Sequence, residues 1–302
     1  MIANGSARSR RYAQVDVFTT RAGYGNPVAV VFDADDLDDA AMQRFAAWTN
    51  LSETTFVLTP RQAAADFRLR IFTPRQELPF AGHPTVGTTH AVLEAYDTLA
   101  GCERLQLECA AGLLPARVER SGPRPLIFVQ APAAQLAAIA DALGGALAGA
   151  LGVAAEAVAM TRSVDIGPRW LLAELVDAHA VRRLQPDLGA IAALTTRHRS
   201  VGVAAFGPEP SGDAAIAVRV FCPADGINED PVTGSANAAI GALLHASGAL
   251  DAIGHRYRAS QGREVGRDGI VEIVVDPGNG VVEIGGACVT CIRGLLEFEA
   301  HS

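Results

Sequence analysis

A chain of 302 residues is long enough to bury a large core and is expected to form two domains. With 49% apolar and 19% charged residues, its composition is that of a soluble globular protein and excludes a disordered one. The formal net charge of −8, without any Lys/Arg cluster, argues against nucleic acid or an anionic membrane as a partner.

The first half of the chain is predicted to consist mainly of strands. Residues 1–10 are expected to be a disordered leader, and no apolar core of a signal peptide follows them, so a cytoplasmic location is expected. A helix is expected after the acidic run Asp33 to Asp39, and an apolar helix at Pro84 to Tyr96. Strands are expected at 12–18, 28–32, 56–58, 67–72, 105–109, 114–118 and 126–130.

The second half opens with an Ala-rich run, Ala131 to Ala159. Asp141 and several glycines interrupt this run, so it is a weak membrane candidate and is interpreted as a surface helix with its connections. Helices are also expected near Val181 to Leu194 and at Pro231 to Leu244. Strands are expected at 158–160, 170–175, 201–206, 216–221, 257–260, 270–275, 281–284 and 287–298.

Two stretches about half a chain apart read as copies of one another. Each has a β-branched and aromatic strand that stops at a proline, then a polar residue and a second proline that begins an apolar helix. The copies predict an α+β fold of two pseudo-symmetric halves, each a β-barrel-like sheet around a central buried helix. The expected domains are 11–125, completed by about 293–302, and 126–292. The copies are Arg70 to Pro74 with Gly82 to Ala91, and Arg219 to Pro223 with Glu229 to Ala238.

The starts of the two buried helices are the predicted site. Their first backbone N–H groups have no partner inside the helix, so two such ends facing each other across a cleft would suit a small carboxylate. His83 and Asp230 occupy equivalent places in the two copies, and Glu53 stands at the mouth of a strand, which together suggest proton transfer. Two alternatives stay open: Glu53 as an exposed strand-end residue, and Asp230 as a simple helix cap.

Metal and thiol chemistry are the competing interpretations. His83, His90, Glu53 and Asp230 could hold a metal, but the usual two-His spacing on one helix is missing, so a metal is not expected. No glycine-rich phosphate loop or dinucleotide fingerprint occurs in strand–helix context, so a nucleotide cofactor is not expected either. The five cysteines form an odd set without secretory context and are expected to be reduced. Cys288 and Cys291 form a lone CxxC pair, which is interpreted as structural.

Six longer motifs stand out: Gln14 to Thr19, Gly25 to Pro27, Asn50 to Phe56, Leu78 to Thr85, Glu229 to Ser235, and Gln261-Gly262 with Gly266-Arg267. Together they resemble the PhzF-like phenazine-biosynthesis isomerase family over roughly residues 12 to 296. Related racemases of the same fold use two cysteines at the helix mouths, where this chain has His83 and Asp230, so that mechanism is disfavoured. One departure concerns Asp268-Gly269, where members often have Pro-Ser, and it leaves the role of the loop from Gly262 to Gly269 open.

The resemblance implies a diaminopimelate-epimerase-like fold, a homodimer and isomerisation of trans-2,3-dihydro-3-hydroxyanthranilate without a cofactor. It implies Glu53 as the general base, with His83 and Asp230 positioning the substrate and stabilising charge. It implies that Ser52, Gly82, Gly234 and Ser235 hold the substrate, expected to be a small carboxylate. The alternatives are an epimerase or racemase of other substrates, and a binding or regulatory protein of the same fold without turnover.

Overall fold

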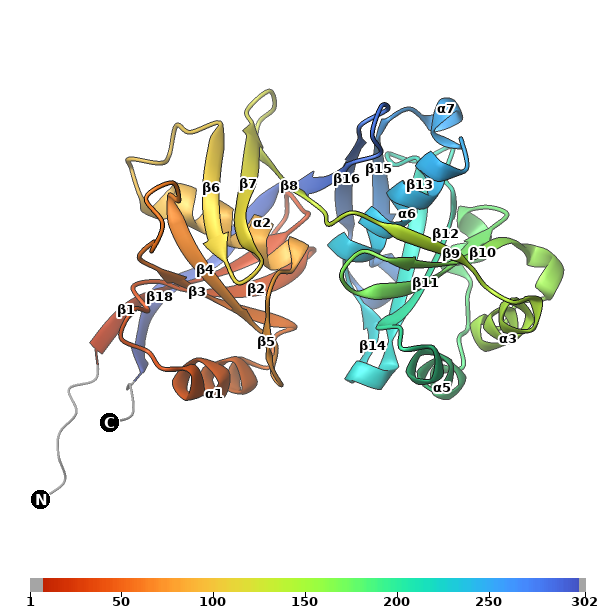
Figure 1. The fold of residues 1–302 in the computed structure, drawn as a ribbon, viewed down its shortest axis with the longest axis horizontal. Helices are drawn as coiled ribbons and strands as arrows, with labels where there is room; N and C mark the ends of the chain where they lie inside the picture. Colours follow the sequence, from red (N-terminus) through yellow and green to blue (C-terminus); the bar gives the residue numbers. More distant parts are fainter. Residues whose placement is uncertain (1–7, 299–302) are drawn as a thin grey trace, which may run out of the picture. The chain divides into compact units, whose positions relative to one another are not determined.

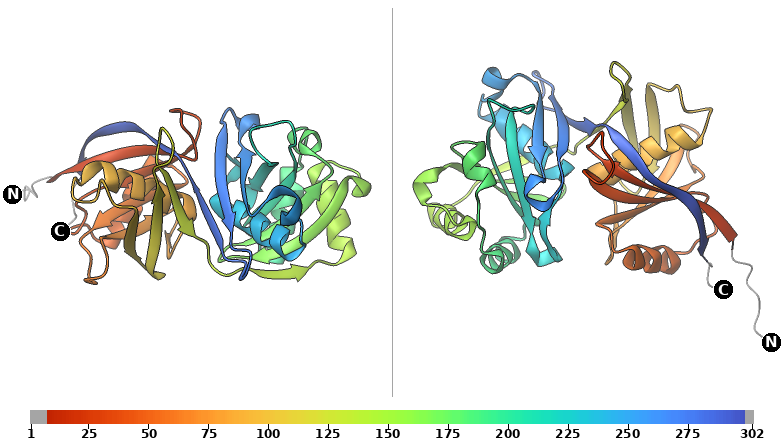
Figure 2. Two further views of the ribbon diagram at one scale, coloured as in Figure 1. Left: turned by 90° about the horizontal axis from the view of Figure 1, so that it is seen from above. Right: turned by 180° about the vertical axis from the view of Figure 1, so that it is seen from behind.

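The computed structural model describes residues 8–298 and divides the chain into two units. The first unit is built from both ends of the chain, up to Val129 and from Gly285 onward, and the second is the continuous segment Gln130–Ile284. In each unit the strands curve around one helix, α2 in the first and α6 in the second (Figures 1 and 2).

In the first unit, helix α1 follows strand β2, and helix α2 follows the short strand β5. The element bounds are β1 Arg8–Val17, β2 Asn26–Val31, α1 Asp39–Thr49, β3 Glu53–Leu58, β4 Phe67–Phe72, β5 Glu77–Leu78, α2 Gly82–Ala95, β6 Arg104–Cys109, β7 Gly112–Glu119, β8 Leu126–Gln130 and β18 Cys288–Phe298. The chain leaves this unit within β8 and returns within β17.

In the second unit, α6 follows the short strand β14 as α2 follows β5. The element bounds are β9 Gln135–Ala138, α3 Asp141–Leu151, η1 Ala155–Ala157, β10 Val158–Asp165, β11 Arg169–Leu175, α4 Ala178–Arg182, α5 Leu188–His198, β12 Gly202–Pro208, β13 Ile216–Cys222, η2 Pro223–Asp225, β14 Ile227–Asp230, α6 Gly234–Ala246, α7 Leu250–Ile253, β15 Arg256–Gln261, η3 Arg263–Val265, β16 Gly269–Val275 and β17 Val282–Gly286.

The two units repeat one strand-pairing pattern. In the first, β1–β2 and β3–β4 are antiparallel, β2–β3 and β4–β6 are parallel, and β6–β7 is antiparallel. In the second, β10–β11 and β12–β13 are antiparallel, β11–β12 and β13–β15 are parallel, and β15–β16 is antiparallel. This repeat confirms the predicted α+β fold of two pseudo-symmetric halves.

The central helices are buried on nearly all sides, as their small and apolar residues predict. Eleven of the fourteen residues of α2 are buried, and the helix contacts β1, β2, β3 and β18. Gly87 marks the closest approach, because a Cβ atom there would lie 2.5 Å from Val28 and 2.7 Å from Val17. Helix α6 is likewise buried and contacts β10, β11 and β16.

An arginine–glutamate pair recurs at the same place in both units. Arg70 of β4 donates Nε and Nη2 to the two carboxylate oxygens of Glu77, at 2.7 and 2.6 Å. Arg219 of β13 does the same to Glu229, at 2.9 and 2.7 Å. Each arginine–glutamate pair links a core strand, β4 or β13, to the neighbouring short strand, β5 or β14, that precedes the central helix.

Three expectations about the elements are corrected. Residues 8–10 of the predicted leader belong to β1, because β18 pairs with them and Arg10 donates hydrogen bonds to the carbonyl of Phe298 and to Asp36, both at 2.7 Å. Residues 1–7 lie outside the described part. The helical stretch near 181–194 is two helices, α4 and α5, interrupted before Asp187, which caps α5.

The third correction concerns the second central helix. It begins at Gly234 rather than at Pro231, and Thr233 before it is extended, with φ of −112°. The backbone N–H of Thr233 and the carbonyl of Asp230 are hydrogen-bonded to the side chain of Gln261, so these groups are satisfied outside the helix.

Candidate functional site

Glu53 is the first residue of β3, where that strand lies parallel to β2 beside Val28. Its side chain is only 16% exposed, although it carries a carboxyl group. Burial raises the pKa of Glu53 to about 7, and the hydroxyl of Ser52 opposes part of that rise. A carboxyl group with such a pKa is well suited to accept and return a proton near neutral pH.

His83 approaches Glu53 from the start of the central helix. It is the second residue of α2, its side chain is 8% exposed, and its Nδ1 atom lies 3.4 Å from Oε2 of Glu53. That Oε2 atom is buried and has no hydrogen-bond partner among the described residues. The structure therefore brings together two predicted site residues that are 30 positions apart.

The neighbours of this pair are also predicted site residues. Gly82 begins α2 directly before His83, and the N-cap residue, Ala81, makes no side-chain hydrogen bond to that helix start. Ser52 precedes Glu53, and its hydroxyl donates a hydrogen bond to Oδ1 of the buried Asn26, at 3.4 Å. Asn26 belongs to the Gly25 to Pro27 motif but was not predicted as a site residue, because its place in a turn before a proline gives no indication of this contact.

His90, considered above as a metal ligand together with His83, has other contacts. Its Nε2 atom lies 3.1 Å from Oγ1 of Thr290 and 3.4 Å from Oε1 of Glu94. Within residues 8–298, no group of three or more His, Cys, Asp or Glu side chains is arranged to hold a metal ion.

The predicted site residues of the second unit gather at the start of α6. Asp230 ends β14 and is buried, while Gly234 and Ser235 are the first two residues of α6. The N-cap residue of α6 is Thr233, so the interpretation of Asp230 as the cap of this helix is wrong. Instead, the hydroxyl of Thr233 donates a hydrogen bond to Oδ2 of Asp230. That His83 and Asp230 face each other stays a prediction.

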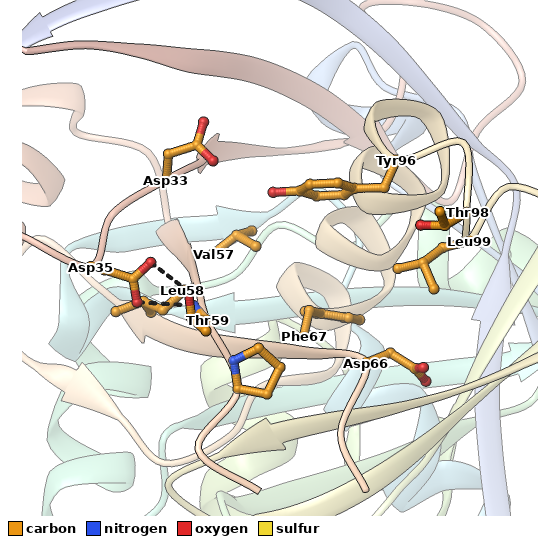
Figure 3. Close-up of a pocket in the computed structure, with 11 residues that line it drawn as sticks. Asp33, Asp35, Val57, Leu58, Thr59, Asp66, Phe67, Tyr96, Thr98 and Leu99 are labelled. Carbon is orange, nitrogen blue, oxygen red and sulfur yellow. Dashed lines mark hydrogen bonds between the residues drawn. The ribbon is translucent and has the colours of Figure 1, made fainter. Parts of the chain in front are cut away.

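Two cavities of the first unit are lined by residues other than the predicted site residues. One of about 270 Å³ has aspartates, aliphatic side chains and Tyr96 in its wall (Figure 3). Another of about 450 Å³ is lined in part by Arg61, Arg68 and Arg70. None of the predicted site residues lines either cavity.

The CxxC pair shows no sign of thiol chemistry. Cys288 is buried and Cys291 exposed on β18, and none of the five cysteines forms a disulfide. Burial raises the pKa of the Cys288 thiol far above its usual value, which disfavours the reactive thiolate. No helix of the described chain has the length and hydropathy needed to span a membrane.

Comparison with known proteins agrees with this architecture. The family model described as "Phenazine biosynthesis-like protein" matches residues 15–294. The chain is 36% identical to the Schizosaccharomyces pombe protein "Antisense-enhancing sequence 1", over 94% of this chain and 97% of that one. It is also 36% identical to the trans-2,3-dihydro-3-hydroxyanthranilate isomerase of Pseudomonas fluorescens, over 86% and 88% of the two chains.

A solved structure extends the similarity to the fold. The Bacillus anthracis phenazine biosynthesis protein of the PhzF family superposes with a TM-score of 0.83 at 26% identity, covering 96% of this chain and 99% of that one. The chain therefore belongs to the phenazine biosynthesis-like (PhzF) family and is an isomerase.

Proposed function

We propose that this isomerase moves a proton on a small carboxylate substrate, without a cofactor, by general acid–base catalysis from Glu53. The observation that carries the proposal is the buried Glu53 carboxyl group, which has a pKa of about 7 and lies 3.4 Å from His83. A protein that only binds its ligand has no need of a carboxyl group tuned in this way, and burying one costs stability.

The proposed reaction has two proton transfers. The Glu53 carboxylate takes a proton from a carbon atom of the substrate, and the electron pair of the broken C–H bond moves into the conjugated system of the substrate. The resulting Glu53 carboxylic acid then gives the proton to a second carbon, which restores the carboxylate. No proton or electron is gained or lost overall, so the product is an isomer of the substrate.

The substrate class follows from the relatives and from the helix starts. Curated relatives named trans-2,3-dihydro-3-hydroxyanthranilate isomerase share 36% identity with this chain, which supports a related carboxylate as the substrate. In the proposal Ser52 and Gly82 hold the substrate near Glu53, and His83 positions it and stabilises charge. The roles implied for Asp230, Gly234 and Ser235, the homodimer and the cytoplasmic location also stay proposals.

Proton exchange in deuterated buffer tests this function directly. NMR spectra would follow a panel of small carboxylates, including trans-2,3-dihydro-3-hydroxyanthranilate, with the parent protein and with Glu53→Gln. The matched control is Glu103→Gln, since Glu103 is an exposed residue of the same unit. Exchange that is lost only in Glu53→Gln supports the proposal; ligand binding without exchange in the parent favours a binding protein without turnover.

A further inference from the structure

Gln261, at the end of β15, is buried and uses its whole amide group in hydrogen bonds. Its Oε1 atom accepts from the backbone N–H of Thr233, at 3.0 Å, and from Nδ2 of Asn237, at 3.1 Å. Its Nε2 atom donates to the carbonyl of Asp230 and to Oγ1 of Thr233, both at 2.9 Å. Two donors and two acceptor positions are the full capacity of an amide side chain.

Two backbone groups fix which way this amide points. The N–H of Thr233 can only donate, so the oxygen of Gln261 must face it, and the carbonyl of Asp230 can only accept, so the nitrogen must face that. The nitrogen therefore also donates to the hydroxyl oxygen of Thr233. The single hydroxyl proton of Thr233 is then directed to the remaining partner, Oδ2 of Asp230.

The loop after Gln261 keeps this arrangement close-packed. Gly262 has a positive φ of 96°, and a Cβ atom there would lie 2.3 Å from the carbonyl oxygen of Pro231. The segment between Asp230 and α6 is thus held against the end of β15 by side-chain hydrogen bonds and by a contact that only glycine permits.

We propose that Gln261 is a positioning residue that acts through Thr233, which it fixes as a hydrogen-bond donor to the carboxylate of Asp230. The inference rests on the proposed function, in which Asp230 contacts the substrate. It gives a role to the Gln261-Gly262 pair, which the sequence marked as part of a motif without a function. Threonine at an N-cap usually accepts a hydrogen bond from the first turn of its helix, but the side chain of Thr233 makes no such bond to α6.

Paired substitutions at Thr233 test the inference. Thr233→Val keeps the shape and removes the hydroxyl, so kcat is expected to fall about tenfold to a hundredfold with little change in KM. Thr233→Ser keeps the hydroxyl and is expected to restore most of kcat. A Thr233→Ser variant as impaired as Thr233→Val would overturn the inference.

A double-mutant cycle separates an effect through Asp230 from a general loss of structure. In the background of Asp230→Ala, which leaves no side-chain acceptor at this position, Thr233→Val is expected to change kcat less than about threefold. An equal loss in both backgrounds contradicts the inference. Gln261→Glu replaces the donor with an acceptor and should behave as Thr233→Val does, whereas the exposed Gln135→Glu is the control without effect.

A measurement that needs no turnover distinguishes this inference from the proposed function. The carboxyl ¹³C signal of Asp230, assigned by its loss in Asp230→Asn, is expected to shift in Thr233→Val and in Gln261→Glu but to stay in Thr233→Ser. If the parent protein isomerises nothing and these shifts occur, the proposed function fails and the positioning contact stands. If the signal does not move in Thr233→Val, the positioning role is wrong whatever the activity.

Discussion

The Nδ1 atom of His83 lies 3.4 Å from Oε2 of Glu53, and the two side chains are 8% and 16% exposed. The contact joins the start of a buried helix to the mouth of a strand. It places a carboxyl group of raised pKa where water is scarce, and the first two predictions follow from that group.

The acid side of the pH–rate profile is expected to follow the ionisation of Glu53. A base must be deprotonated to take the proton, so kcat/KM should rise with pH and level off above a pKa of about 7. Glu53→Gln should lower kcat about 10² to 10⁴-fold and remove this rise. An acid limb that persists in the residual activity of Glu53→Gln would assign the ionisation to another group.

The same substitution is expected to stabilise the fold at high pH. The pKa of Glu53 is raised from 4.5 to about 7 in the folded state, so the folded protein holds a proton that the unfolded chain releases between these values. The contribution of Glu53 to the free energy of unfolding therefore falls as pH rises from about 4.5 to 7.

Glu53→Gln removes this dependence and should raise the free energy of unfolding at pH 8 by at most about 3 kcal/mol relative to its effect at pH 4.5. Urea denaturation of the parent and the variant at both pH values measures it. An equal stability difference between parent and variant at the two pH values would show that burial does not raise the pKa of Glu53.

The two arginine–glutamate pairs, Arg70–Glu77 and Arg219–Glu229, are expected to differ in their contribution to stability. Arg219 and Glu229 are 8% and 11% exposed, whereas Glu77 beside Arg70 is 35% exposed. Removing one partner of a buried pair leaves an uncompensated charge, so Arg219→Ala should cost about 3 to 5 kcal/mol. Arg70→Ala should cost less, because water can solvate Glu77. Denaturant midpoints compare them, and equal costs would contradict the dependence on burial.

Gly87 and Gly149, both inside helices, are predicted to respond oppositely to alanine. A Cβ atom at Gly87 would lie 2.5 Å from Val28, so Gly87→Ala should destabilise the first unit by about 1 to 3 kcal/mol. Within residues 8–298, no atom outside its own helix backbone and chain neighbours lies within 4 Å of a Cβ atom at Gly149 in α3, so Gly149→Ala should stabilise by about 0.5 to 1 kcal/mol. Thermal unfolding of the two variants measures both signs, and a stabilising Gly87→Ala would refute the close contact.

The architecture could be predicted from the sequence because the same local pattern of a strand followed by an apolar helix occurs twice along the chain. Strands β4 and β13 are both rich in β-branched and aromatic residues, and each is followed by an apolar helix, so the repeat could be recognised from the sequence. The start of α6 was predicted wrongly because proline at 231 suggested a helix start. The N-cap residue is Thr233, whose backbone N–H donates a hydrogen bond to the side chain of Gln261, which is distant in sequence.

The proximity of two predicted site residues could be anticipated from the sequence. Glu53 and His83 were singled out because each stands beside a recognisable element end, and the structure places them together. The hydrogen bond from Thr233 to Asp230 and its dependence on Gln261 were missed, since such a network joins residues that no local spacing connects. The pKa of Glu53 depends on burial, which only the folded chain defines.

The pairing of β1 with β18 has a consequence for biosynthesis. The second unit is one continuous segment, whereas the first needs the strand that begins at Cys288, near the end of the chain. During translation, the second unit can therefore complete its sheet while β1 still lacks a neighbour on one edge. That open edge is available for pairing with other chains until β18 has been made, so chaperone demand and aggregation during expression should concentrate on the N-terminal strands.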